Sequence, residues 1–287
     1  VYFTKFNSSN QCFLQFAFNL FVIEINLDGN YSNSIKNSNG DEFFKVKIAK
    51  LKQRRDFPGH YYEVFVMSSI YRAGFKIDFL EKPDGKSSCE CNAKNIISGK
   101  YISVEAKCIN RAPQLGNPEN VVKHNIISKN VKNILKKALG KPHDYPRLIF
   151  IDLNLPDNNI NNSITWIDEA NEAVLELAKE RPHDKPAFIL FTNRSSHYRS
   201  IEESSKDSYG LCGYNISDFG SFVYFDKPSK LYYIKKKYFE IFMIYKAVIE
   251  WQNLPTSFEA NGPSLGESAS GLRRSVTNGG QSFAIFE

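Results

Sequence analysis

The sequence lacks the features that mark membrane proteins, secreted disulfide-bonded proteins and nucleotide-triphosphate enzymes. Its most apolar N-terminal run, CFLQFAFNLFVIEI, is interrupted by Gln15 and Asn19 and has no basic leader, so it predicts a β-strand and no membrane partner. The five cysteines form no even disulfide framework, which predicts reduced thiols in a cytoplasmic protein. No glycine-rich phosphate loop follows a predicted strand, and the histidines lack a Ser or Cys context for nucleophilic catalysis.

The composition that remains indicates a globular chain. Its 287 residues, 42% hydrophobic and 14% aromatic, suffice for one large domain or two small ones. We expect a β-rich N-terminal extension at residues 1–55, an α/β domain at 56–254, and a flexible tail rich in Gly, Ser and Asn at 255–287. A net charge of +6 suits a polyanionic partner without requiring one.

Hydrophobic periodicity predicts an α/β fold with a mixed β-sheet flanked by helices. The predicted helices are HYYEVFVMSSIYRAGF with its end at Gly74, Asn117–Leu139, Thr165–Lys179 and Tyr232–Trp251. The predicted strands are FKIDFLE, SSCECNA, KYISVEAKCI, RLIFIDLNL and PAFILFTN. The last two are unbroken apolar runs separated by a helix, which predicts parallel central strands covered on both faces.

Glu105 and Lys107 give the strand KYISVEAKCI a polar face. Because side chains alternate across a strand, these two residues share a face with Ser103, while the apolar residues between them point to the core. In SSCECNA, Glu90 lies between two cysteines and opposes them in the same way. If the two strands pair as an antiparallel hairpin, Glu90, Glu105 and Lys107 gather on one face.

Such a group suggests metal-dependent chemistry on phosphates. Two neighbouring carboxylates repel each other unless a cation lies between them, and carboxylate, carbonyl and water oxygens suit Mg²⁺ or Mn²⁺. A lysine beside the metal can orient or deprotonate an attacking water and offset charge on a phosphate. The pattern therefore outlines hydrolysis of a phosphodiester. Glu63 adds to it, because a carboxylate within a helix that is apolar nearly all round requires a partner.

This order of elements resembles the PD-(D/E)XK nuclease superfamily, which has the restriction-endonuclease-like fold. The resemblance covers about residues 59–193 and rests on Glu63 in the first helix, an acid in the second strand, and Glu105-Ala106-Lys107 in the third. It implies that Glu105, the first acid and the Ala106 carbonyl bind the metal, and that Lys107 serves the attacking water and the scissile phosphate. Glu63 would be an auxiliary ligand or support one. The implied activity is that of a Mg²⁺- or Mn²⁺-dependent endonuclease, with DNA as the expected substrate.

The first acid has two candidates. Pro83-Asp84 spells the family's dipeptide, but Pro83-Asp84-Gly85-Lys86 also has the composition of an ordinary β-turn. Glu90 lies inside the predicted second strand and is favoured by its position, although Glu replaces the usual Asp and Cys89 replaces the usual Pro. We therefore expect Glu90 to be the ligand and keep Asp84 as the alternative.

Several basic residues are candidates for binding nucleic acid. They are Lys45 and Lys47 in a predicted strand, Arg111 after the third strand, and Lys129, Lys132 and Lys136 on one helix face. The other interpretation of the lysines is a guarded edge strand and the solvated face of an amphipathic helix. Tyr232, Tyr233 and Tyr238 suit a homodimer interface or core packing of the last helix.

Three other interpretations compete with a nuclease. Glu90, Glu105 and Lys107 could form a solvent-facing ladder of ion pairs, each worth under about 1 kcal/mol. The chain could be a catalytically degenerate nuclease-fold protein that binds nucleic acid without cleaving it. Finally, Cys89, Cys91 and Cys108 could bind a structural zinc, although no fourth ligand is evident.

Overall fold

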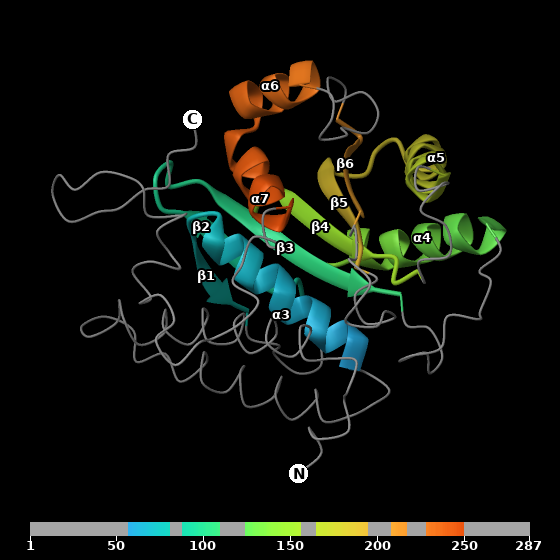
Figure 1. The fold of residues 1–287 in the computed structure, drawn as a ribbon, viewed down its shortest axis with the longest axis horizontal. Coiled ribbons are helices and arrows are strands. Elements are labelled where there is room, and N and C mark those ends of the chain that lie inside the picture. Colours follow the sequence, from blue (N-terminus) through green and yellow to red (C-terminus); the bar gives the residue numbers. More distant parts are fainter. Residues whose placement is uncertain are drawn as a thin grey trace, which may run out of the picture.

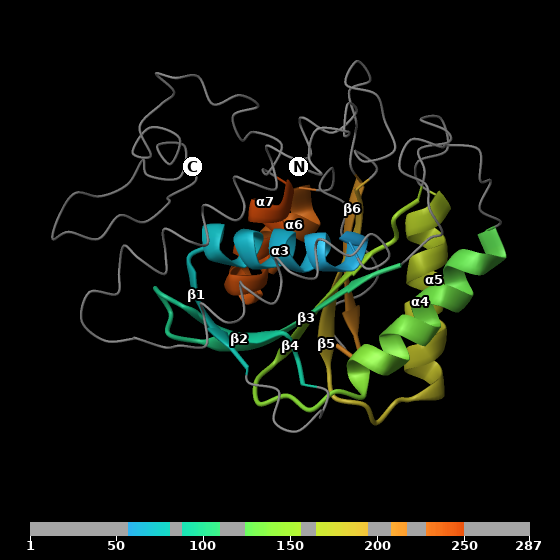
Figure 2. The ribbon, with the colours of Figure 1, turned by 90° about the horizontal axis from the view of Figure 1, so that it is seen from below.

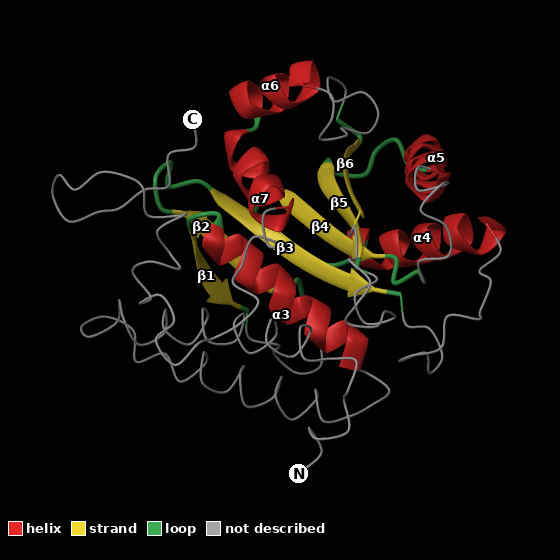
Figure 3. Ribbon diagram, in the orientation of Figure 1, coloured by secondary structure: helices red, strands yellow, loops and turns green. Residues whose placement is uncertain are grey.

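The chain folds as a six-stranded mixed β-sheet flanked by helices (Figures 1 and 3). The computed structural model describes residues 57–80, 88–109, 124–155, 165–194, 208–216 and 228–249. The helices in these ranges are α3 (Phe57–Arg72), α4 (His124–Leu139), α5 (Thr165–Glu180), α6 (Pro228–Lys237) and α7 (Phe239–Ile249). The strands are β1 (Phe75–Phe79), β2 (Cys91–Asn95), β3 (Tyr101–Cys108), β4 (Arg147–Asp152), β5 (Ala187–Asn193) and β6 (Ser208–Tyr214). The predicted α/β class is confirmed; the predicted extension 1–55 and tail 255–287 lie outside the described residues.

The strands follow one another in chain order across the sheet. β1, β2 and β3 pair antiparallel, β3, β4 and β5 pair parallel, and β6 returns antiparallel to β5. The two parallel steps each contain a crossover helix, α4 and then α5, so right-handed crossovers place both helices on the same face of the sheet. The predicted parallel pairing of the two apolar strands is confirmed, and both are buried along their length.

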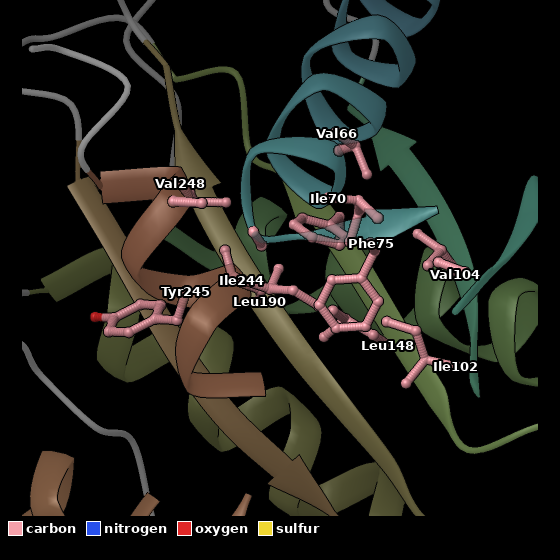
Figure 4. Packing of buried hydrophobic residues seen from close by; sticks show 14 of the residues in the cluster. Val66, Ile70, Phe75, Ile102, Val104, Leu148, Leu190, Ile244, Tyr245 and Val248 are labelled. Atoms are coloured by element: carbon pink, nitrogen blue, oxygen red, sulfur yellow. The ribbon is translucent and has the colours of Figure 1, made fainter. Parts of the chain in front are cut away.

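Each face of the sheet has its own hydrophobic core, and the two faces appear edge-on in Figure 2. On one face α3 and α7 pack against residues such as Val104, Leu148 and Leu190, which Figure 4 shows together with Phe75 and Ile244. On the other face α4 and α5 cover the alternate residues of β4 and β5, such as Ile149 and Ile189. The apolar residues of β3 enter the first core, whereas its alternate residues, Ser103, Glu105 and Lys107, are polar and join neither core.

Two predicted elements differ from the structure. β6 was not predicted, because its sequence SYGLCGY carries glycines and a weak apolar alternation. The predicted single helix Tyr232–Trp251 is wrong: α6 ends at Lys237 and α7 begins at Phe239, with the two helices at an angle in Figure 1. The bend lets α7 bury its apolar residues on the sheet while the lysines at the end of α6 stay exposed.

Gly74, which was predicted to end the first helix, has a φ of +82° just beyond Arg72. A Cβ at this position would meet no atom within 4 Å, so the cost of Gly74→Ala comes from the backbone alone. We expect this substitution to lower the free energy of unfolding by about 1 kcal/mol, measured by urea denaturation. Gly140→Ala is the matched control, because its backbone is not left-handed and its Cβ would make ordinary contacts. Equal stability of the two variants would contradict the expectation.

Among the described helices, none has both the length and the apolar character needed to cross a bilayer.

Candidate active site

The hairpin of β2 and β3 brings Glu90 beside Glu105. The last paired residues of the two strands are Cys91 and Val104, and the Glu90 N–H donates to the Val104 carbonyl at 2.9 Å. One step further along the register, Glu90 stands opposite Glu105, where side chains of antiparallel strands share a face. The strand predicted at SSCECNA begins later than expected, at Cys91, so Glu90 immediately precedes β2 rather than lying inside it. The predicted shared face is nevertheless present.

Both carboxylates are buried. Glu105 is 1% exposed and Glu90 is 6% exposed. The Lys107 Nζ lies 2.5 Å from Glu105 Oε1, and the lysine side chain keeps 27% exposure near the end of β3. The solvent-facing ladder of ion pairs is therefore wrong, because these carboxylates are removed from water and depend on the cations that reach them.

A second ammonium, from Lys141, lies at the same carboxylates. Its Nζ is 2.7 Å from Glu105 Oε1, 2.9 Å from Oε2, and 3.6 Å from Glu90 Oε1. The cation that the sequence pattern required between the two acids is thus supplied by the chain itself. Sequence reasoning missed Lys141 because it lies 36 residues from Glu105, and only the crossover through α4 returns the chain to this face.

The loop that carries Lys141, residues 140–146 between α4 and β4, is tied to both strands of the hairpin. Asn92 on β2 donates to Asp144 at 3.3 Å, and its amide oxygen accepts from Ser103 on β3 at 2.8 Å. The Ser103 hydroxyl also accepts from the Tyr145 N–H at 3.2 Å. These bonds join the loop to the hairpin at the pair Asn92 and Ser103, two residues from each acid, so Lys141 is held at the site by more than its own ion pairs.

The charge states follow from this environment. Burial raises the pKa of Glu105 above its usual value, and Glu90 adds to the rise, whereas Lys107 and Lys141 oppose it. Burial alone would lower the pKa of Lys107, but the attraction of Glu105 outweighs it and leaves the pKa raised. Lys107 is therefore an ammonium at neutral pH and acts as a donor and a positive charge rather than as a base.

The oxygen donors of the group fit a hard divalent cation. Carbonyls two residues apart in a strand point the same way. The Ala106 carbonyl therefore points toward the β2 side of β3, as the Val104 carbonyl does, but it lies past the point where the pairing with β2 ends at Cys91. Within the described residues, no three His, Cys, Asp or Glu side chains converge on one point. Two carboxylates and a carbonyl, completed by water and a substrate phosphate, match the way Mg²⁺ is bound in proteins.

Glu63 lies apart from this group. It belongs to α3, which covers the face of β3 formed by residues such as Val104 and Ala106, and its Oε2 lies 3.2 Å from His60 Nδ1. Glu105 points to the opposite face, where it meets Lys141. The partner that a carboxylate on this helix requires is thus provided locally by His60.

The predicted nucleic-acid ligands fall into two sets. Lys45, Lys47 and Arg111, together with the alternative first acid Asp84, lie outside the described residues. On α4, Lys132 pairs with Glu176 and with Glu180 at 3.7 Å, and Lys136 pairs with Glu180 at 3.4 Å. Both lysines therefore join α4 to α5, while Lys129 is exposed on the same helix.

The tyrosines predicted for a dimer interface separate into exposed and packed residues. Tyr232 on α6 is 69% exposed and Tyr233 is also exposed. Tyr238, at the bend between α6 and α7, packs edge-on against Phe188 with 4.8 Å between ring centroids. Of the two interpretations, core packing therefore applies to Tyr238.

The three cysteines of the zinc interpretation have separate surroundings. Cys89 Sγ lies 3.5 Å from the Pro142 carbonyl, and Cys91 Sγ lies 3.5 Å from Met67 Sδ in the α3 core. Cys108 Sγ lies 3.7 Å from Asp152 Oδ2. Burial raises the pKa of Cys89 to about 11, which keeps this thiol protonated when no metal is bound. A shared zinc site is therefore not supported by these residues.

A second polar group, not anticipated from the sequence, lies at the carboxyl ends of β4 and β5 on the α3 face. The Thr192 hydroxyl donates to Asp152 Oδ1 at 2.7 Å and lies 3.0 Å from the Tyr62 hydroxyl, which then donates to it. The Arg194 N–H also donates to Asp152, and its guanidinium stacks 3.8 Å from the centre of the Phe65 ring. Burial raises the pKa of Asp152 to about 6.

Comparisons of the chain with protein-family models, with curated proteins and with solved structures found no match in any of the three.

Proposed function

We propose that the protein is a metal-dependent nuclease of the PD-(D/E)XK type, acting on DNA. The order α3–β1–β2–β3–α4–β4, with two antiparallel steps followed by a parallel one, agrees with the core expected of that superfamily. The mild positive charge of the chain, +6, is compatible with a polyanionic substrate. Fold alone does not carry an activity, so the proposal rests on the site.

One observation carries the proposal: two buried carboxylates share a face of the β2–β3 hairpin, and the Lys107 ammonium lies 2.5 Å from one of them. An isolated pair of buried acids costs several kcal/mol, so a fold that keeps them needs a compensating cation or a use for them. The spacing Glu105-Ala106-Lys107 places both the acid and the ammonium on the polar face, with the intervening carbonyl at the strand edge.

Each residue of the group has a chemical role in phosphodiester hydrolysis. Glu90, Glu105 and the Ala106 carbonyl would hold Mg²⁺ or Mn²⁺, which when bound polarises the phosphate and acidifies water. Lys107, held as an ammonium by Glu105, donates to a non-bridging phosphate oxygen and offsets the negative charge that develops there. Burial of the carboxylates excludes bulk water and strengthens these electrostatic contacts.

A second function is favoured by a different observation. With Lys107 and Lys141 at the two carboxylates, the group contains two acids and two ammoniums and is neutral without a metal. A catalytically degenerate nuclease-fold protein that binds nucleic acid would have such a site. Cleavage and binding measurements separate the two functions.

We expect the wild-type protein to nick supercoiled plasmid in Mg²⁺ or Mn²⁺, and Lys107→Met to lower the rate by about 100-fold or more, because a donor to the phosphate is lost. The rates are measured on supercoiled, linear and single-stranded DNA, with a chelator as the metal-free reference. Lys137→Met is the matched control, since Lys137 is exposed on the last turn of α4.

The same assay on Glu90→Gln and Asp84→Asn identifies the first acid. Of these two variants, the one that loses a metal ligand should stop cleaving DNA, and the other should cleave as wild type does. Cleavage that persists in chelator, or that is unchanged in Lys107→Met, would reject the proposal. Salt-sensitive DNA binding without cleavage would favour the degenerate protein instead.

A further inference from the structure

We propose that Lys141 is a built-in counter-ion that fills the cation position between Glu90 and Glu105, and that a divalent metal must displace it in order to bind. This inference rests on the proposed function, because it concerns how the same carboxylates acquire their metal. It adds a residue that lies outside the D/E-x-K motif and that no spacing in the sequence indicates.

The first support is the position of the ammonium. Lys141 Nζ contacts both oxygens of Glu105, at 2.7 and 2.9 Å, and also faces Glu90 at 3.6 Å. A cation that bridges two carboxylates would lie in the same place. Because two cations cannot share that position, the ammonium and the metal exclude one another.

The second support is the balance of charge. In the described arrangement the two negative carboxylates are matched by the two positive lysines. A dication added to all four groups would leave a buried excess of two positive charges, which is unfavourable in a site removed from water. If Lys141 withdraws, the excess falls to one, which the single negative charge of a phosphodiester offsets.

The third support is that the side chain can withdraw while its backbone stays. The loop 140–146 is tied to the hairpin through Asn92 and Ser103, but the lysine stem is long and flexible, and the side chain as a whole is 11% exposed. A tethered ammonium returns readily because its effective concentration at the carboxylates is high. The apparent affinity of wild-type protein for metal is therefore reduced by this internal competition.

The test compares Mn²⁺ binding to wild type, Lys141→Met and the control Lys137→Met, with free Mn²⁺ measured by electron paramagnetic resonance. We expect Lys141→Met to bind Mn²⁺ about tenfold more tightly than wild type, and Lys137→Met to match wild type. Thermal unfolding gives an independent measurement. Without metal, Lys141→Met should have a lower melting temperature than wild type, and added Mn²⁺ should raise the melting temperature of Lys141→Met by more than that of wild type.

A second measurement uses the unaltered protein, so it does not depend on how the variant folds. Acetylation by an amine-reactive reagent is followed at Lys141 and at Lys137 by mass spectrometry, with and without Mn²⁺. We expect Mn²⁺ to accelerate labelling of Lys141, because its ammonium is released, and to leave Lys137 unchanged.

The outcomes distinguish this inference from the proposed function. If wild type binds Mn²⁺ and Lys141→Met binds it equally or more weakly, the counter-ion role alone is overturned. The same holds if Mn²⁺ does not accelerate the labelling of Lys141. No binding to either protein overturns the metal site and the inference with it. Tighter binding in Lys141→Met without DNA cleavage by any variant supports the counter-ion role and rejects the nuclease.

Discussion

Replacing Glu105 by Gln is expected to lower the free energy of unfolding by about 3 kcal/mol, as removal of one partner from a buried ion pair does. Glu105 is almost fully buried, and the ammoniums of Lys107 and Lys141 both meet at its carboxylate. Gln preserves the shape of the side chain but not its charge. The two ammoniums then face each other with Glu90 as the acid left to offset them.

The measurement is urea denaturation at neutral pH in the presence of a chelator, followed by circular dichroism. Glu176→Gln is the matched control, because it removes an exposed carboxylate from its pair with Lys132. We expect the double variant Glu105→Gln, Lys107→Met to be more stable than the sum of the two single losses implies, since the second change removes an uncompensated charge. A loss at Glu105 no larger than at Glu176 would contradict the buried-pair interpretation.

The second large effect concerns Asp152 and the dependence of stability on pH. Burial raises its pKa from 3.8 to about 6 in the folded protein. Because the folded state keeps this proton to a higher pH than the unfolded state, the stabilisation is complete below about pH 4 and is lost as the pH rises through about 6. The loss is about 3 kcal/mol, because a rise in pKa from 3.8 to about 6 corresponds to roughly a hundredfold tighter hold on the proton in the folded state.

Asp152→Asn has no carboxyl to ionise, and its amide oxygen can still accept from Thr192 and from the Arg194 N–H. We therefore expect wild type to lose about 3 kcal/mol relative to Asp152→Asn between pH 4 and pH 7, measured by urea denaturation at several pH values. Asp168→Asn makes the same change of charge at an exposed position on α5. Parallel pH profiles for wild type and Asp152→Asn would show that this carboxyl does not titrate differently in the folded state.

The sequence allowed the shared face of Glu90, Glu105 and Lys107 to be predicted, because alternation along a strand and pairing across a hairpin are local rules. Lys141 could not be predicted in this way. Its contact depends on where the crossover through α4 returns to the sheet, which no spacing encodes. The Asp152 group was missed for a similar reason: it requires the register of β4 against β5 and the docking of α3 above them.

Helix periodicity also has a limited reach. The helical pattern predicted the apolar residues of α7 correctly but joined them to α6 in one helix. The pattern does not show that the lysines at the end of α6 stay in solvent while α7 enters the core, which requires a bend between the two helices. The prediction that a carboxylate on the first helix needs a partner was confirmed, and the partner, His60, lies three residues away on the same helix, a contact that helical spacing alone allows.

The loop between α4 and β4 is a poor site for inserting a tag or a fused domain. A short connection between a helix and a strand usually accepts inserted residues, tags or new chain ends, but this one is bonded to both strands of the hairpin and carries an ammonium into their carboxylates. The turn at residues 96–99 does not reach the carboxylates: Ile96 and Ile97 are exposed, the Ile97 and Ser98 N–H groups donate to Asn95, and the Ile96 N–H donates to the Gly74 carbonyl. Of the two connections, this turn is the better point of entry for a fused domain.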